Sequence, residues 1–221
     1  MRVDSAELAQ KHWNETPLYV SESERYSRYP WLFEVAEFRS HPRQRVLEVG
    51  CGTGCDLLQF AKYGAHATGI DITDEHLRLA RQRVGNLAEV IKADARDLPF
   101  SNESFDYVYS HGVLHHSDEP ERCAAEVVRV LRPGGRFNIH LYALWSKTAL
   151  SGRLRYGKRW KLHIENSDSP VHLDLYSARR FQRLFPGCTM QFSKHDCSRL
   201  QFASSWFGWY IVGKGQKPNF Q

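Results

Sequence analysis

The stretch V-L-E-V-G-C-G-T-G-C-D, residues 46–56, is the most informative part of the sequence. It runs strand-forming residues around Glu48 and then places Gly50, Gly52 and Gly54 at alternate positions. Glycine is costly to order, so three glycines so close together indicate a backbone that bends sharply or meets a ligand at short range. We therefore expect a binding turn here, and the flanking segments indicate what it binds.

Strands and amphipathic helices alternate from residue 45 onward, which predicts βαβ units and a parallel sheet. The ligand of such a sheet lies beyond the carboxyl ends of its strands, which is where Gly50 to Gly54 follow the first strand. The predicted strands are 45–50, 66–71, 88–94, 104–112 and 136–144. The predicted helices are 55–64, 73–84 and one that begins near residue 118 and is ended by Pro133-Gly134-Gly135.

The two ends of the chain do not follow this alternation of strands and helices. Residues 1–40 have helical patterning with many aromatic residues, broken into short pieces at Pro17 and Pro30, which predicts an N-terminal cover docked on the main domain. After a helix at 177–185, two strands at 188–196 and 204–215 follow without a helix between them. This succession predicts an antiparallel addition to one edge of the sheet.

Composition limits the class of protein. The chain has 221 residues, 42% of them hydrophobic and 25% charged, which fits one globular domain. It has no apolar run of about 18 residues and no apolar signal-peptide core, so we expect a cytoplasmic protein with no membrane partner. Its five cysteines contain no C-x-x-C pair, so we expect no structural metal site. A net charge of +5 by itself favours neither an acidic substrate nor nucleic acid.

The glycine turn discriminates between two ligand classes. Gly50-x-Gly52-x-Gly54 is one residue shorter than the dinucleotide fingerprint, and Glu48 would repel a pyrophosphate but suit a cation. Asp71 closes the second strand, where a carboxylate accepts ribose hydroxyls. Asp94 follows the third strand, within reach of an amine on a base. S-adenosylmethionine carries an ammonium, a carboxylate, a ribose and an exocyclic amine, so it fits this layout.

At these residues the sequence resembles the class I S-adenosylmethionine-dependent methyltransferases. The segments that match, in the family's order, are VLEVGCGTG, GIDIT, KADARDLPF, FDYVYSHGVLHHSDEP and RVLRPGGRF, covering about residues 45–140. The sequences of these segments are most similar to those of the small-molecule methyltransferases related to the quinone C-methyltransferases. The resemblance implies a three-layer, Rossmann-like α/β sandwich whose seven-stranded, mostly parallel sheet has the order 3-2-1-4-5-7-6, with the last strand antiparallel.

The resemblance also implies a donor site. Its residues would be Gly50, Cys51, Gly52 and Gly54 along the methionine portion, Glu48 near the amino group, Asp71 on the ribose, Ile72 on the adenine face, Asp94 and Ala95 at the adenine edge, and His111 beside the sulfonium. Structural alternatives stay open: the glycines could form a tight turn, Asp71 could cap a helix, and Asp94 could cap the turn that follows it.

The reacting centre needs a base only if the nucleophile arrives protonated. His111, His115 and His116 cluster after the fourth strand, and histidine is the plausible base at neutral pH. Packing and hydrogen bonding in a helical turn is the alternative role for His115 and His116.

Two segments are candidate covers of the acceptor pocket. We divide the single domain into an N-terminal cover (1–40), a donor-binding core (45–142), an acceptor lid (143–176) and a C-terminal helix with antiparallel strands (177–221). In the lid, Arg155 and Arg159 are candidates to hold an anionic or aromatic acceptor, and a solvated basic surface is the alternative. Tyr19 is a candidate contact from the N-terminal cover.

The expected function is transfer of a methyl group from S-adenosylmethionine to an O, N or C nucleophile of a small-molecule acceptor by in-line displacement, with S-adenosylhomocysteine as product. The alternatives are a nucleic-acid methyltransferase, which the absence of an appended recognition domain disfavours, and a non-catalytic module that binds S-adenosylmethionine. The acceptor, the pathway and the oligomeric state cannot be inferred from the sequence.

Overall fold

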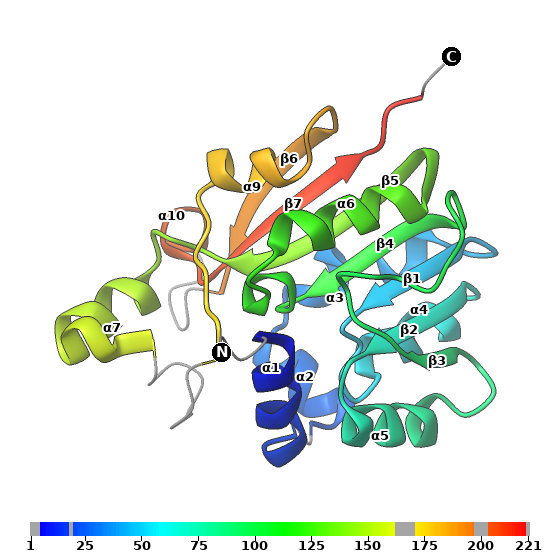
Figure 1. Cartoon of the computed structure of the whole chain (residues 1–221), viewed down its shortest axis with the longest axis horizontal. Coiled ribbons are helices and arrows are strands. Elements are labelled where there is room, and N and C mark those ends of the chain that lie inside the picture. Colours follow the sequence, from blue (N-terminus) through cyan, green and yellow to red (C-terminus); the bar gives the residue numbers. More distant parts are fainter. Residues whose placement is uncertain (1–4, 18–19, 162–170, 197–202, 220–221) are drawn as a thin grey trace.

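A computed structural model describes residues 5–17, 20–161, 171–196 and 203–219, and it is built on one seven-stranded sheet with the order β3-β2-β1-β4-β5-β7-β6 (Figure 1). The strands are β1 (Arg45–Val49), β2 (His66–Asp71), β3 (Glu89–Lys92), β4 (Phe105–His111), β5 (Leu131–Tyr142), β6 (Thr189–His195) and β7 (Tyr210–Gln216).

The sheet is parallel except at one edge. β1 pairs in parallel with β2 and β4, β2 with β3, and β4 with β5, whereas β7 is antiparallel to both of its neighbours, β5 and β6. The predicted fold class, strand order and antiparallel last strand are confirmed. The carboxyl ends of β1, β2 and β4 therefore meet at one edge, which positions the site.

Side chains of each central strand alternate between two buried faces, as the two-residue period of a strand requires. In β1, Val46 packs into the cluster under α4, whereas Leu47 and Val49 pack into the cluster under α6. In β4, Tyr107 joins the first cluster and Val108 the second. With helices over both faces, the molecule has three layers (Figure 1). The core helices are α4 (Cys55–Lys62), α5 (Asp74–Val84), α6 (Pro120–Val130) and α9 (Ala178–Leu184).

The N-terminal segment forms short helices that pack on this sandwich. They are α1 (Ser5–Glu15), α2 (Glu22–Arg28), α3 (Leu32–Val35) and the 3₁₀ turn η1 (Phe38–Ser40). Leu32 and Phe38 are buried in the cluster under α4. The segment thus contributes to the core and lies beside the carboxyl ends of the strands.

Two predicted boundaries were wrong. The strand expected at 204–215 begins only at Tyr210, because residues before it form the short helix α10 (Ser204–Phe207), which ends where the Gly208 amide donates to the Ser204 carbonyl. A side chain at Gly208 would meet the His195 carbonyl at 2.5 Å, so glycine is required at this junction. The helix expected to end at Pro133-Gly134-Gly135 already ends at Val130, and this Pro-Gly-Gly belongs to β5.

The region predicted as a lid begins with α7 (Lys147–Tyr156) and the 3₁₀ turn η3 (Gly157–Arg159), which extend to one side of the sandwich (Figure 1). A further 3₁₀ turn, η2 (Leu114–His116), follows β4. Within the described ranges, no helix is both long enough and apolar enough to cross a membrane.

Candidate functional site

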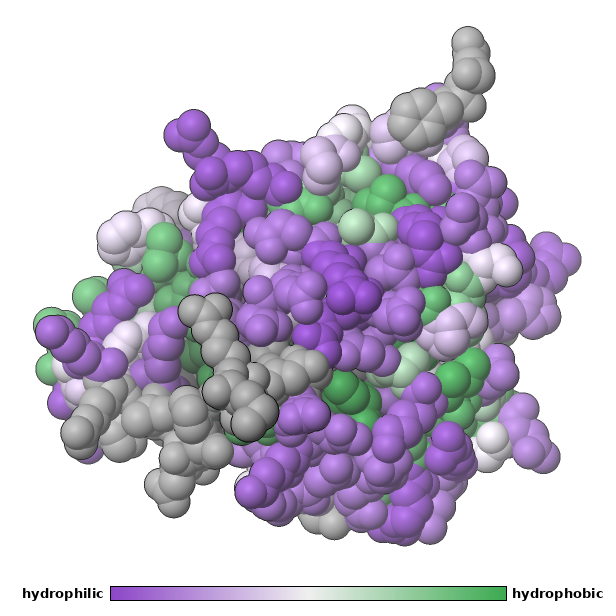
Figure 2. All heavy atoms as spheres, in the orientation of Figure 1, coloured by the Kyte–Doolittle hydropathy of each residue, from purple (hydrophilic) through white to green (hydrophobic). Residues whose placement is uncertain are grey.

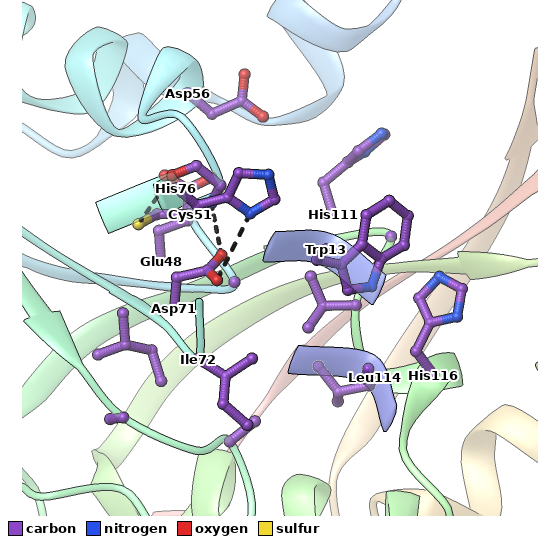
Figure 3. A pocket seen from close by; sticks show the side chains of 18 of the residues that line it. Trp13, Glu48, Cys51, Asp56, Asp71, Ile72, His76, His111, Leu114 and His116 are labelled. Carbon is purple, nitrogen blue, oxygen red and sulfur yellow. Dashed lines mark hydrogen bonds and ion pairs between the residues drawn. The ribbon is translucent and has the colours of Figure 1, made fainter. Parts of the chain in front are cut away.

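A cavity of about 220 Å³ opens at the carboxyl ends of β1, β2 and β4 (Figure 3). Nine of the ten residues predicted to bind the donor line it: Glu48, Gly50, Cys51, Gly52, Asp71, Ile72, Asp94, Ala95 and His111. The tenth, Gly54, is not among the described lining residues. A side chain at Gly54 would lie 3.2 Å from the Ala80 backbone, so this glycine lets α4 approach α5 closely.

The turn after β1 has the conformation that its glycines predict. Gly50 and Gly52 have φ angles of +72° and +51°, in the left-handed region that other residues rarely adopt. A side chain at Gly50 would collide with Val113, whose Cγ2 would be 2.3 Å away. A side chain at Gly52 would meet no atom within 4 Å, so the backbone there borders open space. This is the surface along which a ligand can approach the main chain.

Glu48 is a buried carboxylate beside the cavity. Its Oε2 is shielded from water and has no hydrogen-bond partner among the described residues. Burial, reinforced by the negative charge of Asp56, raises the pKa of Glu48 well above its usual range. A buried acceptor without a partner is rare and calls for an explanation. A cationic ligand group in the cavity would supply both a donor and a compensating charge.

Asp71 ends β2 with its carboxylate held in place. Oδ2 accepts from the Gly52 amide at 2.9 Å, while Oδ1 accepts from the amide and hydroxyl of Thr73 at 3.0 and 2.8 Å. His76 lies 3.7 Å from Oδ1 (Figure 3). Although burial opposes ionisation, the hydrogen bonds from His76 and Thr73 keep the pKa of Asp71 below its usual value. An ionised, oriented acceptor thus borders the cavity, as ribose hydroxyls require.

Asp94 lines the cavity and also organises its own turn. Its carboxylate accepts from the Arg96 backbone amide at 2.8 Å and pairs with the Arg96 guanidinium at 2.8 Å. Asp94 can therefore both cap its own turn and face a ligand in the cavity, and adenine recognition by Asp94 stays a prediction.

The N-terminal segment contributes charge to the site, which sequence reasoning missed. Arg25 of α2 forms a bidentate pair with Asp56 of α4, and both line the cavity. The Asp56 side chain is fully buried and also accepts from the hydroxyls of Tyr109, at 3.0 Å, and Tyr26, at 2.9 Å. The opposite charges of Arg25 and Asp56 could have indicated this pair. They were overlooked because the two residues lie about 30 positions apart in the sequence. His76, another lining residue, was also missed.

His111 ends a buried chain of hydrogen bonds that fixes where its proton lies. The Asn138 amide nitrogen donates to the Val35 carbonyl at 2.7 Å, so the amide oxygen faces His140 Nε2 at 2.9 Å. A carbonyl oxygen only accepts, so His140 carries its proton on Nε2 and offers a bare Nδ1. Nδ1 of His111, 2.8 Å away, must then be the donor.

His111 Nε2 is consequently the nitrogen without a proton. It is shielded from water and has no described hydrogen-bond partner. Burial lowers the pKa of His111 well below its usual value, so the ring is neutral near pH 7. Its neighbours are aromatic, with ring centroids of Tyr210, Tyr29 and Trp31 at 4.5, 5.7 and 6.0 Å. His111 therefore lines the cavity as a neutral imidazole whose unprotonated Nε2 is enclosed.

The other two histidines differ from His111. His116 lines the cavity, packs edge-on against Trp13 and bonds through Nδ1 to the His172 carbonyl at 2.9 Å; burial lowers its pKa to about 4. His115 is fully buried against the Tyr142 ring, at a centroid distance of 3.9 Å, and is not among the described cavity residues. A catalytic role fits the position of His115 least well.

The predicted acceptor contacts do not gather at this cavity. Arg155 is exposed on α7, with its guanidinium over the Tyr156 ring, and is not among the described lining residues. Tyr19 and the side chain of Arg159 lie outside the described part of the chain. Their roles stay predictions. No group of three or more His, Cys, Asp or Glu residues with metal-site geometry occurs in the described ranges.

Part of the chain is similar to known methyltransferases. A methyltransferase-domain family model matches residues 47–139. An O-methyltransferase, rstn1, of Aspergillus nomiae is 37% identical over 113 residues, which cover 48% of this chain and 50% of that protein. The demethylmenaquinone methyltransferase of Clavibacter sepedonicus is 38% identical over 98 residues, which cover 43% and 40%. The chain thus spans about half the length of these relatives, or less.

Whole-chain similarity is seen at the level of fold. The methyltransferase solved with the Trm112 methyltransferase activator of Haloferax volcanii has a TM-score of 0.75, at 17% identity over 96% of this chain and 98% of that one. The chain is thus similar to methyltransferase domains over residues 47–139, and its fold over nearly its whole length is that of the class I S-adenosylmethionine-dependent methyltransferases. The unpartnered Glu48 oxygen, the open backbone at Gly52 and the oriented Asp71 fit S-adenosylmethionine, the methyl donor of that class.

Proposed function

We propose that this protein transfers a methyl group from S-adenosylmethionine to a small-molecule acceptor. The observation that carries the proposal is the cavity after β1, which is lined both by an open glycine backbone at Gly52 and by Glu48, whose Oε2 has no partner among the described residues. This pairing suits a ligand with an ammonium group and disfavours a diphosphate. When bound, the donor supplies an activated methyl group on a sulfonium.

The chain's own residues would mainly hold donor and acceptor in line and exclude water from them, because a sulfonium needs little covalent help. Glu48 would hold the donor's ammonium, the turn at Gly52 its methionine backbone, and Asp71 its ribose. Trp13 and Arg25 of the N-terminal segment line the same cavity, so this segment would help to enclose the reacting groups.

His111 is the best placed of the three histidines to act as base. We assign it the task of accepting the acceptor's proton at Nε2 as the methyl group is transferred, while its Nδ1–H stays bonded to His140. The site loses the sulfonium charge as the imidazole gains one, so its net charge is conserved during the step. A base is needed only for an acceptor that arrives protonated, such as a phenol.

The printed names of relatives include O-methyltransferases, a demethylmenaquinone methyltransferase and a cycloartenol C-24-methyltransferase. They support a small-molecule acceptor and leave the methylated atom open. A cytoplasmic location and a role in small-molecule biosynthesis are further parts of this proposal. The net positive charge of the chain is only weak support for nucleic acid as the acceptor.

Formation of S-adenosylhomocysteine tests the proposal. Purified protein would be incubated with S-adenosylmethionine and a metabolite extract, DNA or RNA, each in a separate reaction. We expect product only with the extract. Product with DNA or RNA would establish the nucleic-acid alternative, and donor binding without product in any reaction would establish a non-catalytic binding module.

A further inference from the structure

Large apolar side chains are exposed on one side of the molecule, away from the cavity. Seven exposed large apolar residues occur in the described ranges, and six of them lie on α7, α10 and the loop before α7. We call these six the α7–α10 face: Trp145, Leu150, Leu154, Tyr156, Trp206 and Phe207. The seventh, Leu87, lies between α5 and β3. Monomeric soluble proteins rarely leave apolar side chains gathered in this way without a use.

The orientation of α7 is inverted relative to an ordinary surface helix. Its buried face is made of small residues: Ala149 is fully buried, and a side chain at Gly152 would lie 3.1 Å from the Trp160 ring. Its outer face carries Leu150 and Leu154, one helical turn apart and 54% and 80% exposed. Since the large apolar residues of the helix point away from the protein, burial in the fold is not their function.

The two halves of the face are joined. The Lys194 ammonium donates to the Trp145 carbonyl at 2.7 Å and to the Trp206 carbonyl at 3.0 Å, so the loop before α7 and α10 lie side by side. Apolar side chains appear among polar ones on the side of the molecule that α7 occupies (Figure 2). Trp145 and Trp206 are 66% and 74% exposed.

The charge along the α7 part of the face has one sign. Residues 143–163 contain no Asp or Glu but six Lys or Arg residues: Lys147, Arg153, Arg155, Lys158, Arg159 and Lys161. Lys147, Arg155 and Lys158 are exposed. Exposed tryptophans and leucines interspersed with cations match the interface of an anionic bilayer, where tryptophan occupies the headgroup level and cations meet lipid phosphates.

We propose that the α7–α10 face docks on the surface of an anionic lipid membrane. The sequence predicted no membrane partner because the chain lacks an apolar run long enough to span, but a face that lies on the bilayer needs no such run. The inference is independent of methyl transfer, because it concerns residues outside the donor cavity.

Vesicle flotation tests the proposal with the whole protein. We expect it to float with mixed phosphatidylcholine–phosphatidylglycerol vesicles, to bind pure phosphatidylcholine vesicles much more weakly, and to be released by salt. Leu154→Glu should reduce binding by about tenfold or more, whereas the matched control Leu87→Glu should not change it. Lys158→Glu should reduce it by at least about fivefold at low salt, and Lys11→Glu, an exposed control on α1, should have little effect.

Circular dichroism and thermal melting would verify that each variant is folded. No flotation of folded wild-type protein with mixed vesicles would overturn the proposal, as would equal losses in the control variants. Concentration-dependent dimerisation in ultracentrifugation that Leu154→Glu abolishes, without vesicle binding, would also overturn it and make the face an interface between copies of this chain.

Discussion

Substitution of Glu48 by glutamine should affect stability and donor affinity in opposite directions. The change keeps the shape of the side chain and removes its charge. In the free protein, burial raises the pKa of Glu48, so the folded state binds its proton more tightly than the unfolded state does. The free energy of unfolding that protonated Glu48 contributes is therefore lost as the pH rises above the pKa of this group in the unfolded chain. Glu48→Gln should thus be as stable as wild type, or more stable, at neutral and alkaline pH.

Donor binding should weaken in the same variant. A charge-assisted hydrogen bond contributes about 1.5–3 kcal/mol, so loss of the carboxylate opposite the ammonium should raise the Kd for S-adenosylmethionine by about 10- to 150-fold. Because the ammonium prefers ionised Glu48, wild-type binding releases a proton and its affinity should rise with pH through the raised pKa. Glu48→Gln should lack this rise.

Isothermal calorimetry in buffers of different ionisation enthalpy, with thermal melting alongside, measures both effects. Glu89→Gln, on the exposed edge strand β3, is the matched control and should change neither quantity. A variant with unchanged Kd, or one that loses stability and affinity together, would refute the assignment of Glu48 as the ammonium partner.

Three further predictions concern the rest of the site. Arg25→Met leaves the buried Asp56 carboxylate without its cation and should lower the free energy of unfolding in urea by about 3–5 kcal/mol, much of which Arg25→Met/Asp56→Leu should recover; equal losses in both would contradict this. Gly52→Ala should cost about 1–2 kcal/mol of stability, because φ is +51°, and should weaken donor binding in calorimetry, whereas unchanged Kd would mean that no ligand approaches this backbone. His140→Phe removes the acceptor that fixes the His111 tautomer, so kcat with a phenol should fall about tenfold or more while the donor Kd stays unchanged. The ¹⁵N chemical shifts of His111 should show its proton redistributed between the two ring nitrogens. An unaltered kcat would rule out His111 as the base.

The lining of the cavity by Gly50, Gly52 and Asp71 could be predicted because its determinants are local in sequence. Gly50 and Gly52 impose the turn themselves, and Asp71 ends a strand adjacent to β1, so reading the strands in order was enough to bring them together. The position of Gly54 at the contact between α4 and α5 depends on Ala80, which no local pattern shows.

The remaining parts depend on contacts between distant segments. Arg25 reaches Asp56 across 31 positions, and the proton on His111 is set by Asn138 through His140, a chain that begins at the Val35 carbonyl. Pairing of this kind follows from the three-dimensional packing of the N-terminal segment, and a single sequence has no period or motif that announces it.

Direct calorimetric titration of the wild-type protein is the sharpest single measurement. We predict saturable, one-to-one binding of S-adenosylmethionine and of S-adenosylhomocysteine, and no heat of binding with NADH. Binding of NADH in the absence of any response to the two sulfur nucleosides would contradict the account at its base.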